Sequence, residues 1–352
     1  MKGIRKITPY VPGEQPNYSD MIKLNTNENP YPPSQKVAEV LRNFDVGQLK
    51  RYSSIDTLSL KKALGVKHNL SPDHFLIGNG SDEVLAFCFL AFFNSPDPIL
   101  FPDITYGFYK VWADLFQIPF KEIPLNNQFE LVEEDYKQLN GGIIIANPNA
   151  PTGLFKPLAE IERILKENQE VIVIIDEAYI DFADQSAVTL LDSYPNLIII
   201  RTFSKSNSLA GLRVGYAIGN PPYIQIAASI KSSFNPYSVD RLAEKLATAA
   251  VEDEEYYVGI TRKICETREW FAKKIENSGF SSLFSKTNFV LMTHPDLKIK
   301  KLYDYLETQN VFVRYFPEIQ RLNNYLRISI GTQEEMEQVY QLLSSYLDRN
   351  KA

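Results

Sequence analysis

The sequence has few of the residues that build disulfide frameworks and metal sites. Its 352 residues include two cysteines, Cys88 and Cys265, and three histidines, His68, His74 and His294. Two cysteines are too few for a disulfide framework, and no histidine or cysteine pair has the spacing of a zinc site. The sequence therefore predicts neither a disulfide-stapled fold nor a metal centre.

Excess positive charge and long apolar runs are also lacking. There are 37 lysines and arginines against 43 acidic residues, a net charge of −6, so nothing in the overall charge attracts nucleic acid or an anionic membrane. The longest apolar run, residues 84–93, is far shorter than the ~20 residues that span a bilayer. Residues 1–6 are not followed by the apolar stretch of a signal peptide. We expect a soluble, cytoplasmic protein with neither nucleic acid nor membrane as partner.

Three common catalytic and nucleotide-binding signatures are absent as well. The sequence contains no G-x-x-x-x-G-K-[ST] loop, no G-x-G-x-x-G turn and no G-x-S-x-G elbow. The sequence therefore does not indicate nucleotide binding or serine hydrolysis by their usual motifs. An enzyme with this composition is expected to draw its chemistry from an organic cofactor.

The composition itself is that of a globular protein, with 44% apolar and 23% charged residues. At about 150 residues per domain, the length predicts two domains. The changes in pattern along the chain predict an N-terminal arm and small-domain segment at 1–33, a large domain at 34–240, and a smaller C-terminal domain with a bridging helix at 241–352.

Short apolar runs rich in β-branched residues recur in the middle of the chain, at 98–101, 142–146, 171–175, 197–202 and 213–218. Helical patterns lie around them, such as a helix expected over 56–64 and stopped by Gly65. Continuous apolar strands that alternate with helices are typical of a mostly parallel sheet covered on both faces. The sequence thus predicts an α/β fold with a second, smaller α/β unit.

Polar side chains follow three of these strands directly. Asn149 comes after 142–146, Asp176 and Tyr179 come after 171–175, and Lys205 comes after 197–202. Because ligands of open parallel sheets bind beyond the carboxyl ends of the strands, we expect these side chains to share one reactive site. Each also fits an ordinary role, Asp176 as the cap of a turn and Lys205 as a solvated lysine.

A second group of residues suits an anion. The turn Gly78-Asn79-Gly80-Ser81-Asp82 leads from a strand into a helix, whose free N–H groups and dipole favour phosphate. The alternative is an ordinary helix start capped by Ser81. Arg213 is a charge in a strand-like apolar context, which requires an anionic partner or an exposed face.

Together these segments resemble the fold-type I pyridoxal-phosphate aminotransferases over essentially the whole chain. The resemblance is carried by Gly80-Ser81-Asp82, Asn149-Ala150-Pro151-Thr152-Gly153, Asp176-Glu177-Ala178-Tyr179, Ser204-Lys205 and Ala210-Gly211-Leu212-Arg213. Within this family the chain is most similar to the histidinol-phosphate aminotransferase subgroup, on Leu24-Asn25-Thr26-Asn27-Glu28-Asn29-Pro30, Arg51-Tyr52, Arg314 and Leu326-Arg327. It implies a large domain with a mostly parallel central sheet flanked by helices and a smaller α/β domain.

The resemblance implies pyridoxal 5'-phosphate as cofactor, held by Lys205 as a Schiff base, with the same lysine then acting as general base and acid. Asp176 would keep the pyridine nitrogen protonated, and Tyr179 would hydrogen-bond the phenolic oxygen of the ring. Tyr106 would stack on the ring, although a core tyrosine is the simpler reading of that position. The remaining cofactor contacts would fall on Gly80, Ser81, Asp82, Asn149, Ser204 and Arg213, and on Tyr52 from the second subunit of a homodimer.

The resemblance also implies the substrates. Arg314 and Arg327 would bind a partner that alternates between a phosphate monoester and a dicarboxylate, and Asn25 and Tyr18 would close over it. The alternative for Arg314 is a surface ion pair. The implied reaction converts L-histidinol phosphate and 2-oxoglutarate into imidazole-acetol phosphate and glutamate in histidine biosynthesis. The alternatives are a threonine-phosphate decarboxylase, an aromatic amino acid aminotransferase, or a non-catalytic ligand-sensing member of the family.

Two positions depart from the family pattern. Ala150 stands where many relatives have an asparagine that contacts the ring oxygen. Either Asn149 takes over this contact or Tyr179 makes it alone. In addition, Arg51-Tyr52 lacks the proline that often follows the tyrosine. Neither departure removes a group that the covalent chemistry needs.

Overall fold

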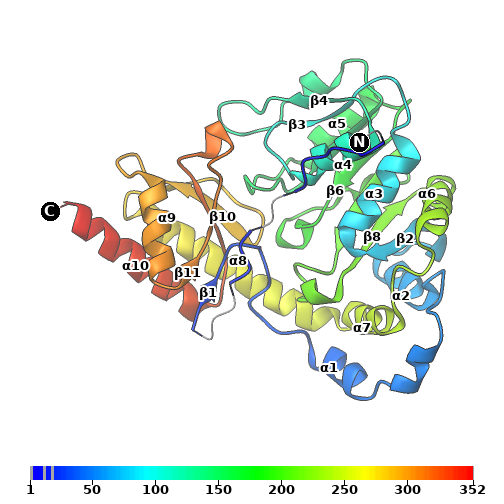
Figure 1. Cartoon of the computed structure of the whole chain (residues 1–352), viewed down its shortest axis with the longest axis horizontal. Helices are drawn as coiled ribbons and strands as arrows, with labels where there is room; N and C mark the ends of the chain where they lie inside the picture. Colours follow the sequence, from blue (N-terminus) through cyan, green and yellow to red (C-terminus); the bar gives the residue numbers. More distant parts are fainter. Residues whose placement is uncertain (1–2, 11–12, 17–19, 352) are drawn as a thin grey trace.

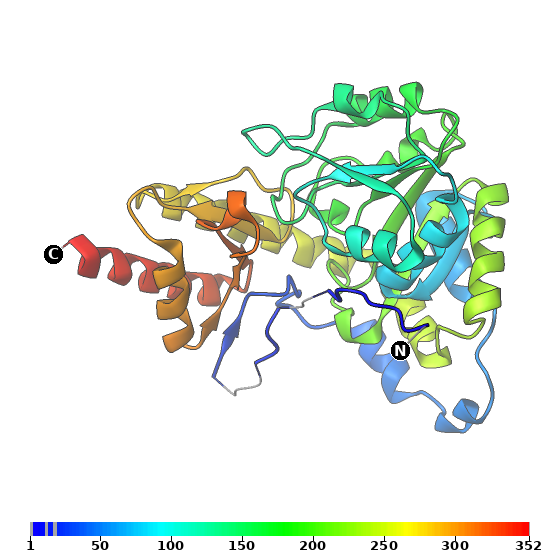
Figure 2. The same cartoon turned by 45° about the horizontal axis from the view of Figure 1, so that its top comes forward.

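The computed structural model describes residues 3–10, 13–16 and 20–351 (Figure 1). Two groups of elements lie side by side, each built around its own sheet, and the long helix α8 (Glu254–Glu276) runs from one group to the other (Figures 1 and 2). None of the helices in these described ranges combines the length and the apolarity needed to cross a bilayer.

The larger group contains, in the described residues, a seven-stranded sheet in the order β2-β8-β7-β6-β5-β3-β4. Its strands are β2 (Phe75–Asn79), β3 (Ile99–Pro102), β4 (Phe120–Ile123), β5 (Gly142–Ala146), β6 (Val173–Asp176), β7 (Leu197–Thr202) and β8 (Val214–Gly219). Only β8 among these strands runs antiparallel to its neighbours, β2 and β7. The sheet is therefore mostly parallel, which confirms the fold class expected from the sequence.

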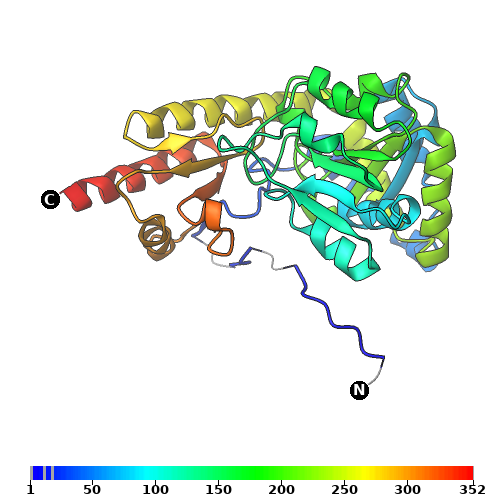
Figure 3. The same ribbon diagram turned by 90° about the horizontal axis from the view of Figure 1, so that it is seen from above.

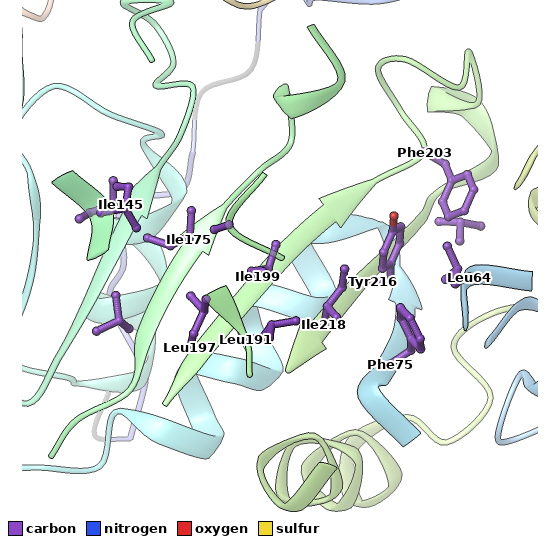
Figure 4. Close-up of a cluster of buried hydrophobic side chains, with 14 of the residues drawn as sticks. Leu64, Phe75, Ile145, Ile175, Leu191, Leu197, Ile199, Phe203, Tyr216 and Ile218 are labelled. Atoms are coloured by element: carbon purple, nitrogen blue, oxygen red, sulfur yellow. The ribbon is translucent and has the colours of Figure 1, made fainter. Parts of the chain in front are cut away.

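Both faces of this sheet are buried. Ile145, Ile175, Ile199 and Ile218 form a row across adjacent strands on one face (Figure 4), where they join apolar residues of α2, α5 and α7. Alternate strand residues, such as Ile144, pack with α3, α4 and α6 on the other face. The helices of this group are α1 (Gln35–Arg42), α2 (Leu58–His68), α3 (Gly80–Phe92), α4 (Phe108–Phe116), α5 (Leu158–Glu167), α6 (Pro221–Phe234) and α7 (Arg241–Val251). Burial on both faces explains why the strands are continuous apolar runs.

The smaller group is built on an antiparallel sheet in the order β12-β13-β10-β9. Its strands are β9 (Ser281–Ser282), β10 (Phe289–Thr293), β12 (Arg314–Tyr315) and β13 (Leu326–Ser329). The N-terminal strand β1 (Ile22–Lys23) joins this group by pairing in parallel with β11 (Val311–Phe312). Helices α9 (Ile299–Thr308) and α10 (Gln333–Lys351) complete it, and α10 packs along α8 (Figure 3).

Two local predictions are wrong. Gly65 does not stop α2, which continues to His68 and ends at Asn69 in the left-handed conformation. A Cβ at Gly65 would stand 2.6 Å from the carbonyl oxygen of Leu70, so this glycine permits a close approach of the returning chain. Arg213 lies just before β8, because its φ of 56° is left-handed and incompatible with a strand. The predicted domain boundaries at 33/34 and 240/241 stay a prediction.

Candidate active site

Three strand ends meet at one edge of the larger sheet. Ala146 of β5 is level with Asp176 of β6, and Asp176 is level with Ile200 of β7. The segments that follow these strands carry the predicted reactive side chains. The Nζ atom of Lys205 lies 5.6 Å from the centroid of the Tyr179 ring and 3.3 Å from the carbonyl oxygen of Thr26.

Asp176 is a buried carboxylate at the last position of β6. Its Oδ2 accepts a hydrogen bond from the hydroxyl of Tyr109 at 2.7 Å, and its Oδ1 accepts one from the N–H of Ala178 at 3.1 Å. Burial raises the pKa of Asp176 to about 6, and the two donors offset this effect only in part. No salt bridge reaches Asp176 from the described residues. A positive charge brought to this carboxylate would therefore stabilise it.

Tyr179 is held by Asn27, which lies in the segment 24–30 that carries the resemblance but for which no role was predicted. Asn27 Nδ2 donates to the Tyr179 hydroxyl at 2.8 Å, and Asn27 Oδ1 accepts from the hydroxyl of Ser329 at 3.0 Å. The Tyr179 ring also meets Phe289 edge-on, with the ring centroids 5.3 Å apart. Since its oxygen accepts from Asn27, the Tyr179 hydroxyl keeps its own hydrogen for a further acceptor.

The predicted anion site gathers around the start of α3. The N–H groups of Ser81 and Asp82 lie in its first turn and have no acceptor within the helix. Arg213 Nη1 donates to the Ser204 hydroxyl at 3.4 Å, and Nη2 lies 3.3 Å from Asp82 Oδ2. Gly80, with a φ of 78°, bridges to Val214 at the start of β8. Backbone donors, a hydroxyl and a guanidinium thus converge at one place, as a bound phosphate requires.

The predicted residues Tyr106 and Asn149 are both engaged with their neighbours. The Tyr106 hydroxyl donates to Asp82 Oδ1 at 2.7 Å. Asn149 Nδ2 donates to the carbonyl oxygen of Ile104 at 3.0 Å and to Thr152 Oγ1 at 2.9 Å. Both amide hydrogens of Asn149 are therefore used, and a contact with a ring oxygen would cost one of these bonds. In this arrangement Asn149 fixes the segment that carries Tyr106.

Arg314 and Arg327 lie directly opposite each other on β12 and β13. Arg327 is half-buried overall with its Nε atom fully buried, and burial lowers its pKa. Its Nη2 donates to the carbonyl oxygen of Asn25 at 3.0 Å, whereas Nε has no hydrogen-bond partner among the described residues. Like charges opposite each other are destabilising, so an anion between the arginines would stabilise both. Asn25 itself donates from Nδ2 to the carbonyl oxygen of Glu14 at 2.8 Å.

Tyr10 is a further site residue that the sequence pattern did not indicate. Its ring stacks on Phe108 at 4.3 Å and lies 6.2 Å from the ring of Tyr106. Burial raises the pKa of Tyr10, and the charges of Arg327 and Arg314 act in the opposite direction. Tyr10 therefore packs beside Tyr106 and within the electrostatic influence of the arginine pair. Its place in a proline-containing arm, without periodicity, left no signal for this.

Two predicted residues lie apart from this cluster or cannot be placed. Tyr52 is 78% exposed and stacks on Tyr237, with the ring centroids 4.6 Å apart. Among the described residues it has no contact with the other predicted site residues. Tyr18 lies outside the described residues.

The comparisons with known proteins agree with this geometry. Residues 19–343 match the family described as aminotransferase class I and II. The chain is 48% identical to the histidinol-phosphate aminotransferase of Lactococcus lactis subsp. cremoris (strain MG1363), over 99% of this chain and 97% of the relative. It is 49% identical to the enzyme of the same name from Marinomonas sp. (strain MWYL1), over 95% of each chain.

Among solved structures, the chain is similar to the histidinol-phosphate aminotransferase of Sinorhizobium meliloti in complex with pyridoxal-5'-phosphate. The TM-score is 0.85 at 25% identity, and the match covers 94% of this chain and 92% of that one. Both the larger sheet and the smaller group are therefore shared with a known fold. The chain belongs to the aminotransferase class I and II family.

Proposed function

We propose that this protein is a pyridoxal-phosphate-dependent enzyme that transfers the amino group of L-histidinol phosphate to 2-oxoglutarate, giving imidazole-acetol phosphate and glutamate in histidine biosynthesis. The observation that carries the proposal is the meeting of Asp176, Tyr179 and Lys205 at one sheet edge, close to a phosphate-type site. Relatives named histidinol-phosphate aminotransferase, at 45–49% identity over nearly the whole chain, support the choice of substrate.

The residues present fit this cofactor. The buried carboxylate of Asp176, with its pKa raised to about 6, suits a protonated pyridine nitrogen, which would supply the missing positive charge. The Tyr179 hydroxyl retains a hydrogen for the phenolic oxygen of the ring. Ser81, Ser204 and Arg213 supply donors of three kinds for the phosphate. When bound, pyridoxal phosphate supplies an electron-accepting ring that stabilises the charge left by removal of the substrate Cα proton.

Lys205 is the residue that moves protons in this proposal. Its Nζ atom is the primary amine at the shared strand edge, and the contact with the Thr26 carbonyl oxygen at 3.3 Å is long enough to be given up. We assign to Nζ the removal of a proton from the Cα of the amino donor and, in the second half-reaction, the delivery of a proton to the Cα of the acceptor. Asn29 steadies the lysine from behind, because its Nδ2 donates to the Lys205 carbonyl oxygen at 3.0 Å.

Arg314 and Arg327 are assigned to the anionic ends of the two substrates. Histidinol phosphate carries a phosphate monoester and 2-oxoglutarate carries a second carboxylate, so one cationic subsite can serve both half-reactions. The unpartnered Nε of Arg327 is a buried donor that such an anion would satisfy. Asn25 lies beside this pair through its carbonyl contact with Arg327. No observation specifically favours the decarboxylase, aromatic aminotransferase or ligand-sensing alternatives. The cytoplasmic location expected from the sequence stays a prediction.

We also propose that the protein is a homodimer in which Tyr52 reaches the phosphate site of the partner subunit. Two segments near α7 expose an unusual number of apolar side chains, namely Val46, Leu49, Tyr52, Ile55, Leu58, Phe234 and Tyr237. Val46 and Phe234 are each 73% exposed. Apolar surface gathered in this way is typical of an interface, and a second copy of the chain would cover it.

The central experiment combines the purified protein with histidinol phosphate and 2-oxoglutarate and follows glutamate. We expect Lys205→Ala to abolish turnover and the visible absorbance of the lysine-bound cofactor, because no other described amine takes its place at this edge. Lys300→Ala removes an exposed lysine from α9 that pairs with Asp304, and it should leave both unchanged. Wild-type turnover in Lys205→Ala would refute the proposed function.

A further inference from the structure

Arg321 links the two groups of elements on the side of the molecule where the arginine pair lies. It belongs to residues 316–325, which connect β12 to β13 and so join Arg314 to Arg327. Its Nη1 donates to the carbonyl oxygen of Leu125 at 2.9 Å, and its Nη2 donates to that of Asn126. Figure 1 shows the turn around residues 320–322, in orange, reaching the connection that follows β4.

The surface that receives Arg321 is fixed by its own contacts. Asp103 Oδ1 accepts the N–H of Leu125 at 2.9 Å, and Asp103 Oδ2 lies 3.7 Å from Arg321 Nη1. The ring of Phe129 lies under the guanidinium, whose central carbon is 4.7 Å from the ring centroid. Two carbonyl oxygens, a carboxylate and an aromatic face thus surround one guanidinium. A lysine could not satisfy this set, because a single ammonium cannot reach both carbonyl oxygens while stacking flat on a ring.

A second contact from the same connection strengthens the attachment. Tyr325, which directly precedes β13, meets the Phe129 ring edge-on with the centroids 5.6 Å apart. Phe129 adopts a left-handed φ of 63°, which is rare for an aromatic residue. The turn that bears Phe129 therefore holds a conformation that offers its ring to both Arg321 and Tyr325.

The attachment joins two parts of the candidate active site. On the larger sheet, Asp103 directly follows β3 and lies three residues before Tyr106. On the smaller sheet, the connection that Arg321 anchors is bounded by the strands that carry Arg314 and Arg327. The two groups also meet where Leu322 and Phe316 of the same connection are buried in the core of the larger group, and where Asn27 donates to Tyr179.

We propose that Arg321 is a positioning residue that holds the Arg314–Arg327 pair at a fixed place over the site and thereby sets the affinity for the anionic end of the substrate. This inference rests on the proposed function. It assigns Arg321 no contact with substrate or cofactor, and its effect passes through the β12–β13 connection. The affinity for a phosphorylated substrate should therefore depend on Arg321 more than the affinity for the same molecule without its phosphate.

The kinetic test compares Arg321→Met with Arg349→Met, which removes an arginine of α10 whose ring contact, with Tyr305, stays within the smaller group. We expect Arg321→Met to raise the KM for histidinol phosphate about tenfold, the loss of one to two charged hydrogen bonds. The KM for L-histidinol, kcat and the absorbance of the bound cofactor should change little, and Arg321→Lys should recover part of the loss. An equal rise of the KM for histidinol phosphate and for L-histidinol would overturn the proposal. So would a KM for histidinol phosphate in Arg321→Met no higher than that in Arg349→Met.

A second measurement does not depend on turnover. Hydrogen exchange of the full-length protein should be at least about threefold faster across residues 314–327 in Arg321→Met than in the wild type, because the connection loses its polar attachment and keeps only its apolar contacts. Unchanged exchange there would overturn the proposal whatever the kinetics. If the wild type forms no glutamate from histidinol phosphate and 2-oxoglutarate, the proposed function fails, while the exchange measurement still decides whether Arg321 holds the pair.

Discussion

The buried carboxylate of Asp176 lowers the free energy of unfolding when it is ionised and no positive charge lies beside it. Its pKa is about 6 in the folded chain, against an ordinary value of 3.8. Between these pH values the folded chain binds more protons than the unfolded chain. The protonated Asp176 therefore favours the folded state. This stabilisation is fully present below about pH 4 and is lost as the pH rises through about 6, where the buried carboxyl must ionise. An ionisable side chain that lowers stability through a strongly shifted pKa is typical of a functional site.

Asp176→Asn should therefore make the cofactor-free protein more stable while it impairs transamination. At about 1.4 kcal/mol per pK unit, we expect a gain of about 3 kcal/mol in the free energy of unfolding at pH 7.5 and almost none at pH 4. The asparagine can still accept from the Ala178 N–H and can donate to the Tyr109 hydroxyl. Urea unfolding of the cofactor-free protein at both pH values measures the difference.

The control for this prediction is Asp114→Asn, which neutralises an exposed aspartate on α4. It should not reproduce the pH-dependent gain. If Asp176→Asn were equally stabilising at both pH values, or destabilising at pH 7.5, burial of its charge would not be the source of the effect.

Single residues divide clearly into those that the sequence could indicate and those that it could not. Asp176 and Lys205 could be selected because each follows a recognisable buried strand. The contacts of Asn27 and Tyr109 could not be predicted, because their partners Tyr179 and Asp176 are 152 and 67 residues away and only the fold brings them together. A polar residue without a local pattern gives no sign of the distant atom it will contact.

At the scale of elements, the phosphate-type site depends on how closely β8 approaches the start of α3. A Cβ at Gly215 would stand 2.3 Å from the backbone nitrogen of Ser81. Gly215→Ala should therefore push the two elements apart, lower the affinity for pyridoxal phosphate, and reduce the free energy of unfolding by about 1–3 kcal/mol. Cofactor titration and urea unfolding would measure the two effects.

Gly211→Ala is the matched control, because a Cβ at Gly211 meets no atom within 4 Å and its φ is not left-handed. It should be neutral or slightly stabilising, since alanine restricts the unfolded chain. If Gly215→Ala bound pyridoxal phosphate as tightly as Gly211→Ala, the close approach of β8 to α3 would not be what shapes the site.

The elements themselves were predictable where burial is complete. Strands β5 and β7 agree with the predicted ranges to the residue, because both faces are covered and the apolar run is uninterrupted. Three elements gave no usable pattern. The edge strand β4 has only four residues with a half-exposed pattern, α4 is short and lacks a side-chain cap, and α6 begins with two prolines and has serines near its end. Their structure depends on packing that a local pattern does not contain.

At the scale of the whole molecule, the described chain holds most of the proposed site within one subunit and leaves Tyr52 outside it. Tyr52 is fixed from behind by the ring of Tyr237 and by Arg241, whose Nη2 donates to the Tyr52 carbonyl oxygen at 2.9 Å. An exposed aromatic residue held in this way can serve another chain without ordering a flexible loop first. If it does, each active site of the dimer contains Lys205 from one subunit and Tyr52 from the other.

This arrangement predicts complementation between two impaired variants. Lys205→Ala lacks the catalytic amine, and Tyr52→Ala should bind pyridoxal phosphate more weakly and be almost inactive when the cofactor is limiting. In a heterodimer, one site combines Lys205 from the Tyr52→Ala subunit with Tyr52 from the Lys205→Ala subunit. Random exchange makes half of the dimers mixed, each with one intact site, so about a quarter of the wild-type activity per site should return on mixing.

The outcome separates a shared site from a self-contained one. If Tyr52 served its own subunit, the mixed dimer would contain one site without Lys205 and one without Tyr52, and no activity would return. A mixture of Lys205→Ala with Asp176→Asn is the control, because both substitutions affect the same side of the site and exchange cannot rebuild it. Native mass spectrometry of the mixture would establish that mixed dimers are present, so that a failure to complement is evidence against the contribution of Tyr52 across the interface.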